Sequence, residues 1–65
     1  MQKIKIIFPD GRVNEYHKGI TPKEIAESIG KRLAEDAVAA KINDRLVDLD
    51  TPINEDSYFQ IITLN

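Results

Sequence analysis

A strong helix-start signal in the first half of the chain constrains its fold more than any other feature. Thr21 can cap a helix, Pro22 suits the first helical position, and the Glu24 side chain can reach back to the Thr21 amide. Ile20 and Ile25 bracket the cap as a hydrophobic staple. The sequence therefore predicts one main helix that starts here. The helix face toward a sheet is predicted to contain Ile25, Ala26, Ile29 and Leu33.

The helix is predicted to end or to be interrupted at Gly30, because glycine is unfavourable inside helices. The next residues, 31–36, have Leu33 and Ala34 as their apolar side chains. They form either a further helical turn or a short second helix, and the sequence leaves both alternatives open.

Apolar residues at every second position predict a β-hairpin before the helix. Residues 2–8 have the period of a strand with one buried face, residues 9–12 hold a proline, an aspartate and a glycine suited to a turn, and residues 12–17 form a second extended stretch. Val13 and Tyr16 differ in parity, so both can face the core only if a bulge intervenes or Tyr16 lies beyond the regular ladder. The sequence leaves this register open. The buried face of the first strand is predicted to be Ile4, Ile6 and Phe8.

A second hairpin and a closing strand are predicted after the helix. Residues 37–42 and 45–49 are predicted strands joined by a tight turn at residues 43–44. Residues 50–56 form a polar, acidic loop, and residues 58–64 form a closing strand rich in aromatic and branched side chains. The side chains predicted to face inward from the first of these strands are Val38, Ala40 and Ile42.

The predicted order ββαβββ indicates an α+β domain. Two hairpins that flank one main helix in so short a chain have few arrangements that bury every apolar face. The first and last strands are the most apolar, so they are expected in the centre of a mixed sheet that packs on the helix. The β-grasp, ubiquitin-like roll satisfies these conditions, with residues 1–65 as a single domain.

Composition excludes several classes of protein. Nine Lys and Arg against eleven Asp and Glu give a net charge of −2, whereas domains that bind nucleic acid tightly on their own are usually basic. The absence of cysteine excludes disulfides, thiolate metal sites and thiol nucleophiles. The first residues do not build the apolar core of a signal peptide, and no apolar run reaches the length of a membrane span. A cytoplasmic chain without a membrane partner is therefore expected.

No catalytic, cofactor-binding or metal-binding residue is predicted. His17 is the single histidine, and the sequence places no activated serine or threonine near it. The three glycines are scattered, so they form no loop that could hold a nucleotide phosphate. Four acidic residues late in the chain lack the ligand spacing and the glycine of a calcium loop. They are Asp48, Asp50, Glu55 and Asp56.

Strand parity does indicate one candidate contact surface. Because the isoleucines of the first strand face inward, Lys3 and Lys5 face outward, and Lys41 does the same on the strand after the helix. Gln60 and Ile62 of the closing strand are expected between them. This mixed face is a candidate for contact with RNA or with a neighbouring domain. The competing interpretation is that the lysines serve solubility alone.

Several stretches of the chain resemble one known family. They are residues 8–11 (FPDG), 19–26 (GITPKEIA), 40–43 (AKIN) and 46–53 (LVDLDTPI), and the likeness extends to residues 61–63. Through essentially its whole length the chain resembles the TGS domain, a family named for threonyl-tRNA synthetases, certain GTPases and guanosine tetraphosphate synthetase/hydrolases. Within this family it is most similar to the amino-terminal domain of bacterial threonyl-tRNA synthetases.

The resemblance implies a β-grasp fold and a non-catalytic accessory or regulatory domain at the start of a larger cytoplasmic enzyme. The parent would be a threonine–tRNA ligase whose ATP, Mg and Zn belong to other domains, so no cofactor and no catalytic residue is carried over to this chain. The implied partners are the adjoining domains of the parent synthetase and, weakly, tRNA. The isolated domain is expected to be a monomer and a fragment of that longer protein.

Two other functions agree less well with the sequence. The alternative parent is a GTPase or a guanosine tetraphosphate synthetase/hydrolase, but regulatory TGS domains of the latter usually carry Thr-Pro-Lys-Gly or a close variant at the first turn. This chain has Pro-Asp-Gly-Arg at residues 9–12. A ubiquitin-like carrier needs a flexible Gly-Gly terminus, whereas residues 62–65 are Ile-Thr-Leu-Asn, in or beside a strand.

Overall fold

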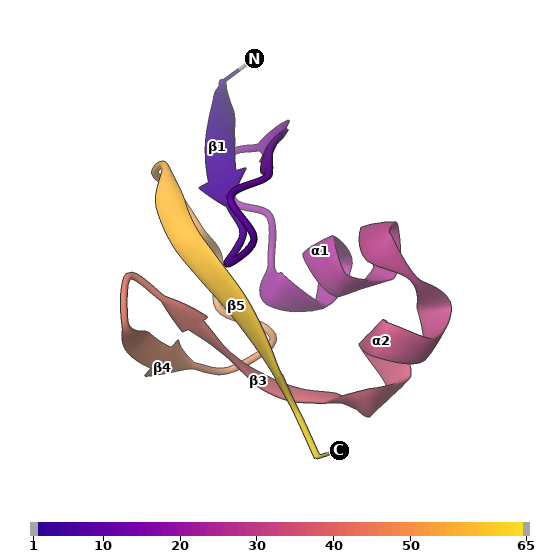
Figure 1. Ribbon diagram of the computed structural model, residues 1–65. Helices are drawn as coiled ribbons and strands as arrows, with labels where there is room; N and C mark the ends of the chain where they lie inside the picture. Colours follow the sequence, from indigo (N-terminus) through magenta and orange to yellow (C-terminus); the bar gives the residue numbers. More distant parts are fainter. Residues whose placement is uncertain (1, 65) are drawn as a thin grey trace.

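The computed structural model describes residues 2–64, and within that range it contains five strands and two helices (Figure 1). They are β1 (Lys3–Ile7), β2 (Val13–His17), α1 (Pro22–Ile29), α2 (Lys31–Asp36), β3 (Ala37–Ile42), β4 (Arg45–Val47) and β5 (Ser57–Thr63). The strands form one mixed sheet in the order β2-β1-β5-β3-β4, in which β1 and β5 are parallel and the other neighbours antiparallel. The predicted α+β β-grasp architecture is therefore confirmed, with the first and last strands adjacent inside the sheet.

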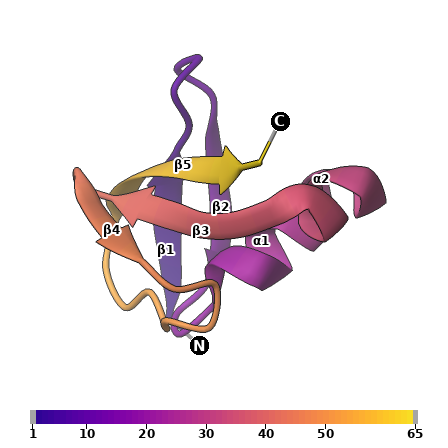
Figure 2. The same cartoon turned by 90° about the horizontal axis from the view of Figure 1, so that it is seen from below.

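Helix α1 packs against one face of the sheet, and α2 lies at the end of the sheet where β3 begins (Figure 2). Ile6 of β1 and Ile25 of α1 are both completely buried, so they mark the centre of the contact between the helix and the sheet. An isolated bridge between Ile20 and Ile53 ties the start of the helix to the loop before β5. The other buried members of the core are Ile4, Phe8, Ala40 and Phe59.

The register of the first hairpin is regular, and it determines which way Val13 and Tyr16 point. β1 and β2 pair without a shift, so Ile4 lies opposite Tyr16 and Ile7 lies opposite Val13. Tyr16 faces inward and packs against the core, whereas Val13 faces outward and is 52% exposed. No bulge is needed between the described residues of this hairpin, because only one of the two side chains enters the core.

A chain of hydrogen bonds ties the edge strand β2 to helix α1. Ser28 Oγ donates to the Ile25 carbonyl oxygen at 2.6 Å, so the Tyr16 hydroxyl, 3.0 Å away, is the donor to Ser28. Asn14 Nδ2 donates to the Tyr16 hydroxyl at 3.5 Å. These bonds hold Tyr16 in its inward orientation.

Strand β3 departs from simple alternation, and the prediction for Val38 is wrong. The register against β5 shifts between Ala37 and Ala39. This irregularity buries Ala37 and leaves Val38 48% exposed, because the extra residue reverses the side-chain parity. Beyond the shift, Ala40 is buried and Ile42 packs against the core, as predicted.

Gly30 separates the two helices, so residues 31–36 form a second helix and not a further turn. Its backbone is extended, and its N–H donates to the Ala26 carbonyl oxygen at 3.0 Å, which ends α1. The expected burial of Ile29 is wrong: this side chain is 44% exposed because it is the last residue of α1, at the end that lies away from the sheet (Figure 1). Leu33 is half-buried on α2.

The capping box predicted at the start of α1 is present, and its contribution can be measured. Glu24 N–H donates to Thr21 Oγ1 at 3.3 Å, and Thr21 N–H donates to Glu24 Oε1 at 3.1 Å. We expect Thr21→Ala to lower the free energy of unfolding by about 1 kcal/mol, because a helix N–H group loses its acceptor. Urea denaturation followed by circular dichroism measures the change. Thr21→Ser keeps the hydroxyl and is the matched control, and equal losses in both variants would contradict a role for the hydroxyl.

The acidic loop before β5 makes a structural contact that the sequence did not indicate. Asp56 Oδ1 accepts a hydrogen bond from the backbone N–H of Lys5 at 2.7 Å, between residues 51 positions apart. β5 pairs with β1 through Ser57 and Tyr58. The Asp56 carboxylate therefore provides the acceptor for a β1 backbone N–H at the point just before the pairing of β1 with β5 begins.

Candidate functional site

The face of the sheet opposite α1 is the candidate contact surface. Successive side chains of a strand point to opposite faces, so the strand register determines which residues share this face. We call it the outer sheet face. Its members include Val13, Glu15 and His17 of β2, Lys3, Lys5 and Ile7 of β1, Tyr58 and Gln60 of β5, Lys41 of β3 and Leu46 of β4.

The three lysines predicted from strand parity are all exposed on the outer sheet face. Lys3 and Lys5 lie near one another on β1, whereas Lys41 lies on β3 beside Gln60, with β5 in between. By the register, Lys5 and Lys41 are separated by two strand spacings, about 10 Å, and by four residues along the strands, about 13 Å. The structure thus brings Lys3 and Lys5 together and places Lys41 at the other end of the face.

A row of apolar side chains, which strand parity alone did not predict, crosses the outer sheet face. Ile7 lies opposite Tyr58 on one side and opposite Val13 on the other. Tyr58 is 66% exposed, although its neighbour Phe59 is buried in the core. The alternation of these two aromatic residues was the available signal for Tyr58, but the parity of Val13 was open until the register was known. Adjacent exposed apolar side chains of this kind are typical of contact surfaces.

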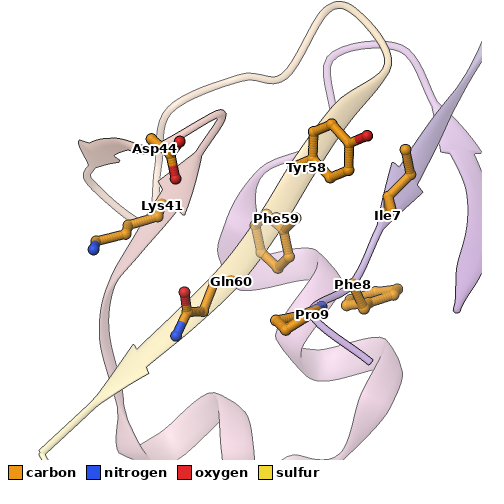
Figure 3. Close-up of a pocket in the computed structure, with 8 residues that line it drawn as sticks. All are labelled: Ile7, Phe8, Pro9, Lys41, Asp44, Tyr58, Phe59 and Gln60. Atoms are coloured by element: carbon orange, nitrogen blue, oxygen red, sulfur yellow. The ribbon is translucent and has the colours of Figure 1, made fainter. Parts of the chain in front are cut away.

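A hollow of about 150 Å³ opens on this face where the chain after β1 leaves β5 (Figure 3). Small-molecule sites usually have volumes of about 300–1,000 Å³. The hollow is therefore of a size for one ring or one side chain. Its lining residues are Ile7, Phe8, Pro9, Lys41, Asp44, Tyr58, Phe59 and Gln60.

The charge of the outer sheet face differs from that of the whole chain. The face carries Lys3, Lys5 and Lys41 against Glu15, whereas the chain has a net charge of −2. Asp44 adds one carboxylate at the hollow. Asp56, whose carboxylate accepts from the Lys5 N–H, adds another. The three lysines and these three carboxylates therefore balance, and the face has no positive surplus.

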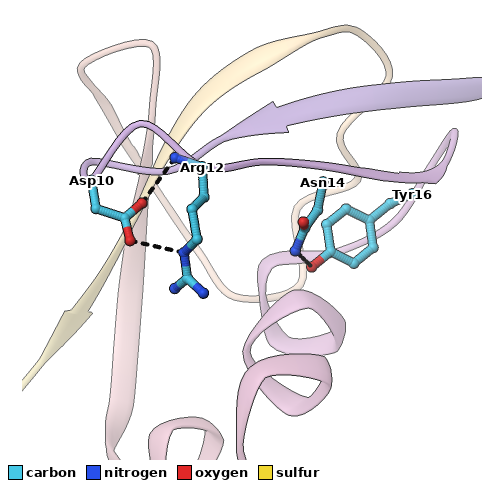
Figure 4. A network of polar contacts seen from close by, with 4 residues as sticks. All are labelled: Asp10, Arg12, Asn14 and Tyr16. Carbon is cyan, nitrogen blue, oxygen red and sulfur yellow. Dashed lines mark hydrogen bonds and ion pairs between the residues drawn. The ribbon is translucent and has the colours of Figure 1, made fainter.

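The turn of the first hairpin contains a charged pair at the surface. The Asp10 carboxylate accepts hydrogen bonds from the Arg12 backbone N–H at 3.0 Å and from Arg12 Nε at 2.8 Å (Figure 4). The backbone bond is the larger cause, and together these contacts lower the pKa of Asp10 below its ordinary value of 3.8. The pair stabilises the turn only while the carboxyl is ionised.

We expect Asp10 to stabilise the fold at pH values above 3.8 and to lose this contribution as the pH falls through its lower folded pKa. An NMR titration of the Asp10 carboxyl carbon measures the folded pKa. The urea midpoints of the parent and of Asp10→Asn should differ at neutral pH and converge once the pH lies well below the folded pKa of Asp10, because both side chains are then uncharged. A titration midpoint at or above 3.8 would contradict the expectation.

His17 is exposed at the end of β2. Within residues 2–64, no group of three or more His, Cys, Asp or Glu side chains could hold a metal ion. Over the same residues, neither helix has the length and the hydropathy of a membrane span.

Comparison with known proteins identifies the family. The family model of the TGS domain matches residues 4–63. The threonine–tRNA ligase of Staphylococcus carnosus is 52% identical over 63 residues, which are 97% of this chain and 10% of the ligase. The corresponding ligase of Syntrophotalea carbinolica is 52% identical over 65 residues (100% and 10%), and that of Phocaeicola vulgatus is 55% identical over 56 residues (86% and 9%). The chain thus spans about a tenth of the length of these curated relatives. By the extent of both matches, it belongs to the TGS domain family.

Proposed function

We propose that this chain is a non-catalytic accessory domain of a threonine–tRNA ligase and that its outer sheet face is a contact surface. The relatives support the first part, because three ligases match this chain at 52–55% identity. Since the chain covers about a tenth of each relative, the ligase activity would belong to the other parts of the parent.

The composition of the outer sheet face is the observation that carries the second part. Tyr58 and Val13 are more than half exposed on either side of Ile7, and lysines lie beyond them. The centres of protein contact surfaces are enriched in aromatic side chains, and their rims are polar. Such a face fits an adjoining domain of the parent synthetase, and its lysines fit the phosphates of tRNA.

The proposed tRNA contact is weak, because the charge available for it is small. Three dispersed lysines can neutralise about three phosphates, and each phosphate contact contributes about −0.7 to −0.9 to the slope of log K against log salt. We therefore expect a dissociation constant that is micromolar or weaker and a slope of about −3 at most.

A titration of the chain with threonine tRNA at low salt tests this contact. The test variant replaces the three lysines of the outer sheet face, Lys3, Lys5 and Lys41, by glutamine, and we expect it to lose binding. The control replaces three lysines that lie in the turn after β2 and on the helices, with the same change in charge: Lys18, Lys23 and Lys31. The lysine contact is refuted if the test variant and the parent give the same binding curve.

We further propose that the chain is one domain of a longer cytoplasmic ligase and is monomeric when isolated. The downstream gene sequence tests the parent: an editing domain supports the ligase, and a GTPase or a guanosine tetraphosphate synthetase/hydrolase in that place would favour the alternative parent. Sedimentation equilibrium of the 65-residue chain tests the monomer, and a mass that rises with concentration would refute it.

A further inference from the structure

We propose that Asp10 is a site of spontaneous isomerisation to isoaspartate, through a cyclic imide formed with the Gly11 main-chain nitrogen, and that Arg12 slows this reaction in the folded chain. The site lies at the turn between β1 and β2 (Figure 4). Three features carry the proposal: the Asp-Gly sequence, the exposure of the turn, and the contacts that hold the Asp10 carboxylate.

The sequence distinguishes Asp10 from every other residue that could form such an imide. It is the one Asp or Asn of the chain that is followed by glycine. Glycine has no side chain to shield its main-chain nitrogen, and its backbone is free to bring this nitrogen to the preceding side chain. We therefore expect the imide to form at Asp10 first. The other aspartates are followed by residues with side chains, and they are Asp36, Asp44, Asp48, Asp50 and Asp56.

The turn leaves the reacting groups accessible. The Asp10 side chain is 56% exposed. Apart from its chain neighbours, no described residue has an atom within 4 Å of the position that a Cβ on Gly11 would occupy. Water can therefore reach the site, and the rest of the fold places no steric barrier around the ring that has to form.

The reaction needs no reactant other than water. The Gly11 nitrogen attacks Cγ of the neutral Asp10 carboxyl, a C–N bond forms, and the carboxyl O–H leaves as water with the proton of the nitrogen. Water then opens the ring at either carbonyl. Opening at the side-chain carbonyl restores aspartate. Opening at the main-chain carbonyl leaves isoaspartate, in which the main chain runs through Cβ and Cγ of Asp10.

The contacts of the folded turn oppose the first step. Asp10 Oδ1 accepts from the Arg12 N–H at 3.0 Å, and Oδ2 accepts from Arg12 Nε at 2.8 Å, so both oxygens are held. The Gly11 N–H donates to the Phe8 carbonyl oxygen at 2.9 Å, so the attacking nitrogen is held as well. The Arg12 contacts, the backbone bond above all, keep the pKa of Asp10 below 3.8, so little of the reactive neutral carboxyl is present at neutral pH. Arg12 therefore protects Asp10.

Isomerisation would alter one end of the outer sheet face. It adds one carbon to the main chain of a turn that is closed by a hydrogen bond of 2.8 Å from the Phe8 N–H to the Arg12 carbonyl oxygen. Phe8 and Pro9 also line the hollow on that face. We expect the isomerised chain to lose this turn geometry and to unfold at a lower urea concentration than the parent.

Incubation of the 65-residue chain at one mildly acidic pH tests the proposal. Mass spectrometry locates isoaspartate after digestion with a protease that cleaves before aspartate and not before isoaspartate. We expect isoaspartate to appear at Asp10 before any other position. Arg12→Ala should isomerise about two- to fivefold faster, which is the factor expected from an exposed ion pair. Arg45→Ala removes an exposed arginine beyond the other hairpin turn, so it is the matched control and should react like the parent.

Two further measurements complete the test, once circular dichroism shows that each variant is folded. The parent in concentrated urea should isomerise faster than the folded parent, because the contacts of the turn are then absent. Asp10→Glu should give no isomerised product at this position, because its longer side chain would have to close a larger and less favourable ring. The proposal is overturned if the unfolded chain forms no isoaspartate at Asp10, or if Arg12→Ala reacts no faster than the parent and Arg45→Ala.

Discussion

Replacing Ile25 by alanine is expected to lower the free energy of unfolding by about 2–5 kcal/mol. The Ile25 side chain is completely buried where α1 packs on the sheet. Its truncation removes apolar contacts and leaves a cavity that the surrounding side chains only partly fill. A 65-residue domain has a total stability of about 3–10 kcal/mol, so this one substitution removes a large part of it.

Urea denaturation of Ile25→Ala and of a matched variant on the same helix checks this expectation. Ile29→Ala removes the same atoms from a side chain that is 44% exposed, and we expect it to cost less than about 1 kcal/mol. Similar losses in the two variants would mean that α1 does not present Ile25 to the core in the way the structure describes.

Replacing Phe59 by alanine is expected to cost about 3–5 kcal/mol. Phe59 lies on the central strand β5, is 2% exposed, and meets Phe8 edge to face, with ring centroids 5.9 Å apart and an interplanar angle of 89°. Such aromatic pairs add about 0.5–1.5 kcal/mol to the effect of buried area alone. The substitution therefore weakens the core where both halves of the sheet meet.

The neighbouring residue supplies the control for Phe59→Ala. Tyr58→Ala changes an aromatic side chain on the opposite face of the same strand, where 66% of it is exposed, so we expect its thermal unfolding to remain close to that of the parent. The pair also separates stability from binding, because Tyr58 lies on the outer sheet face and Phe59 lies in the core. A large stability loss in Tyr58→Ala would show that the Tyr58 ring packs against the protein and is not free to contact a partner.

The parts of the fold that the sequence predicted depend on local signals. Thr21 and Glu24 form the capping box because the two side chains need only the backbone of one helical turn. Ile4 and Ile6 were assigned to the core by alternation alone, which holds for a strand without irregularities. Gly30 was placed correctly as a break, although the sequence did not choose between a turn and a helix after it.

The errors in the fold arise where tertiary geometry overrides a local period. Val38 is exposed because the register against β5 shifts next to it, and the sequence of β3 contains no signal that predicts this shift. Ile29 has the correct helical spacing from Ile25, but α1 ends where it no longer faces the sheet. In both cases the packing between elements changes the burial of a single side chain, and the rest of the element follows its predicted period.

The candidate site was predictable in its lysines, but its carboxylates and its shape were not. Lys3, Lys5 and Lys41 followed from strand parity, and the structure places all three on one face. The hollow beside Tyr58 forms where the chain after β1 separates from β5. The position of this separation is set by the pairing of β1 with β5, between residues about 50 positions apart in the sequence. The contact of Asp56 with the Lys5 amide has the same origin, so it could not be read from the acidic loop.

The order of the strands also bears on how the domain folds during synthesis. β5 is the last strand of this sheet to leave the ribosome, yet it lies between β1 and β3 at the centre of the sheet. Until it emerges, the first hairpin has no neighbour for the inner edge of β1, and its apolar residues remain accessible to chaperones and proteases. A nascent chain arrested before residue 57 would therefore be handled as an unfolded polypeptide, because its sheet still lacks the strand that joins the two halves.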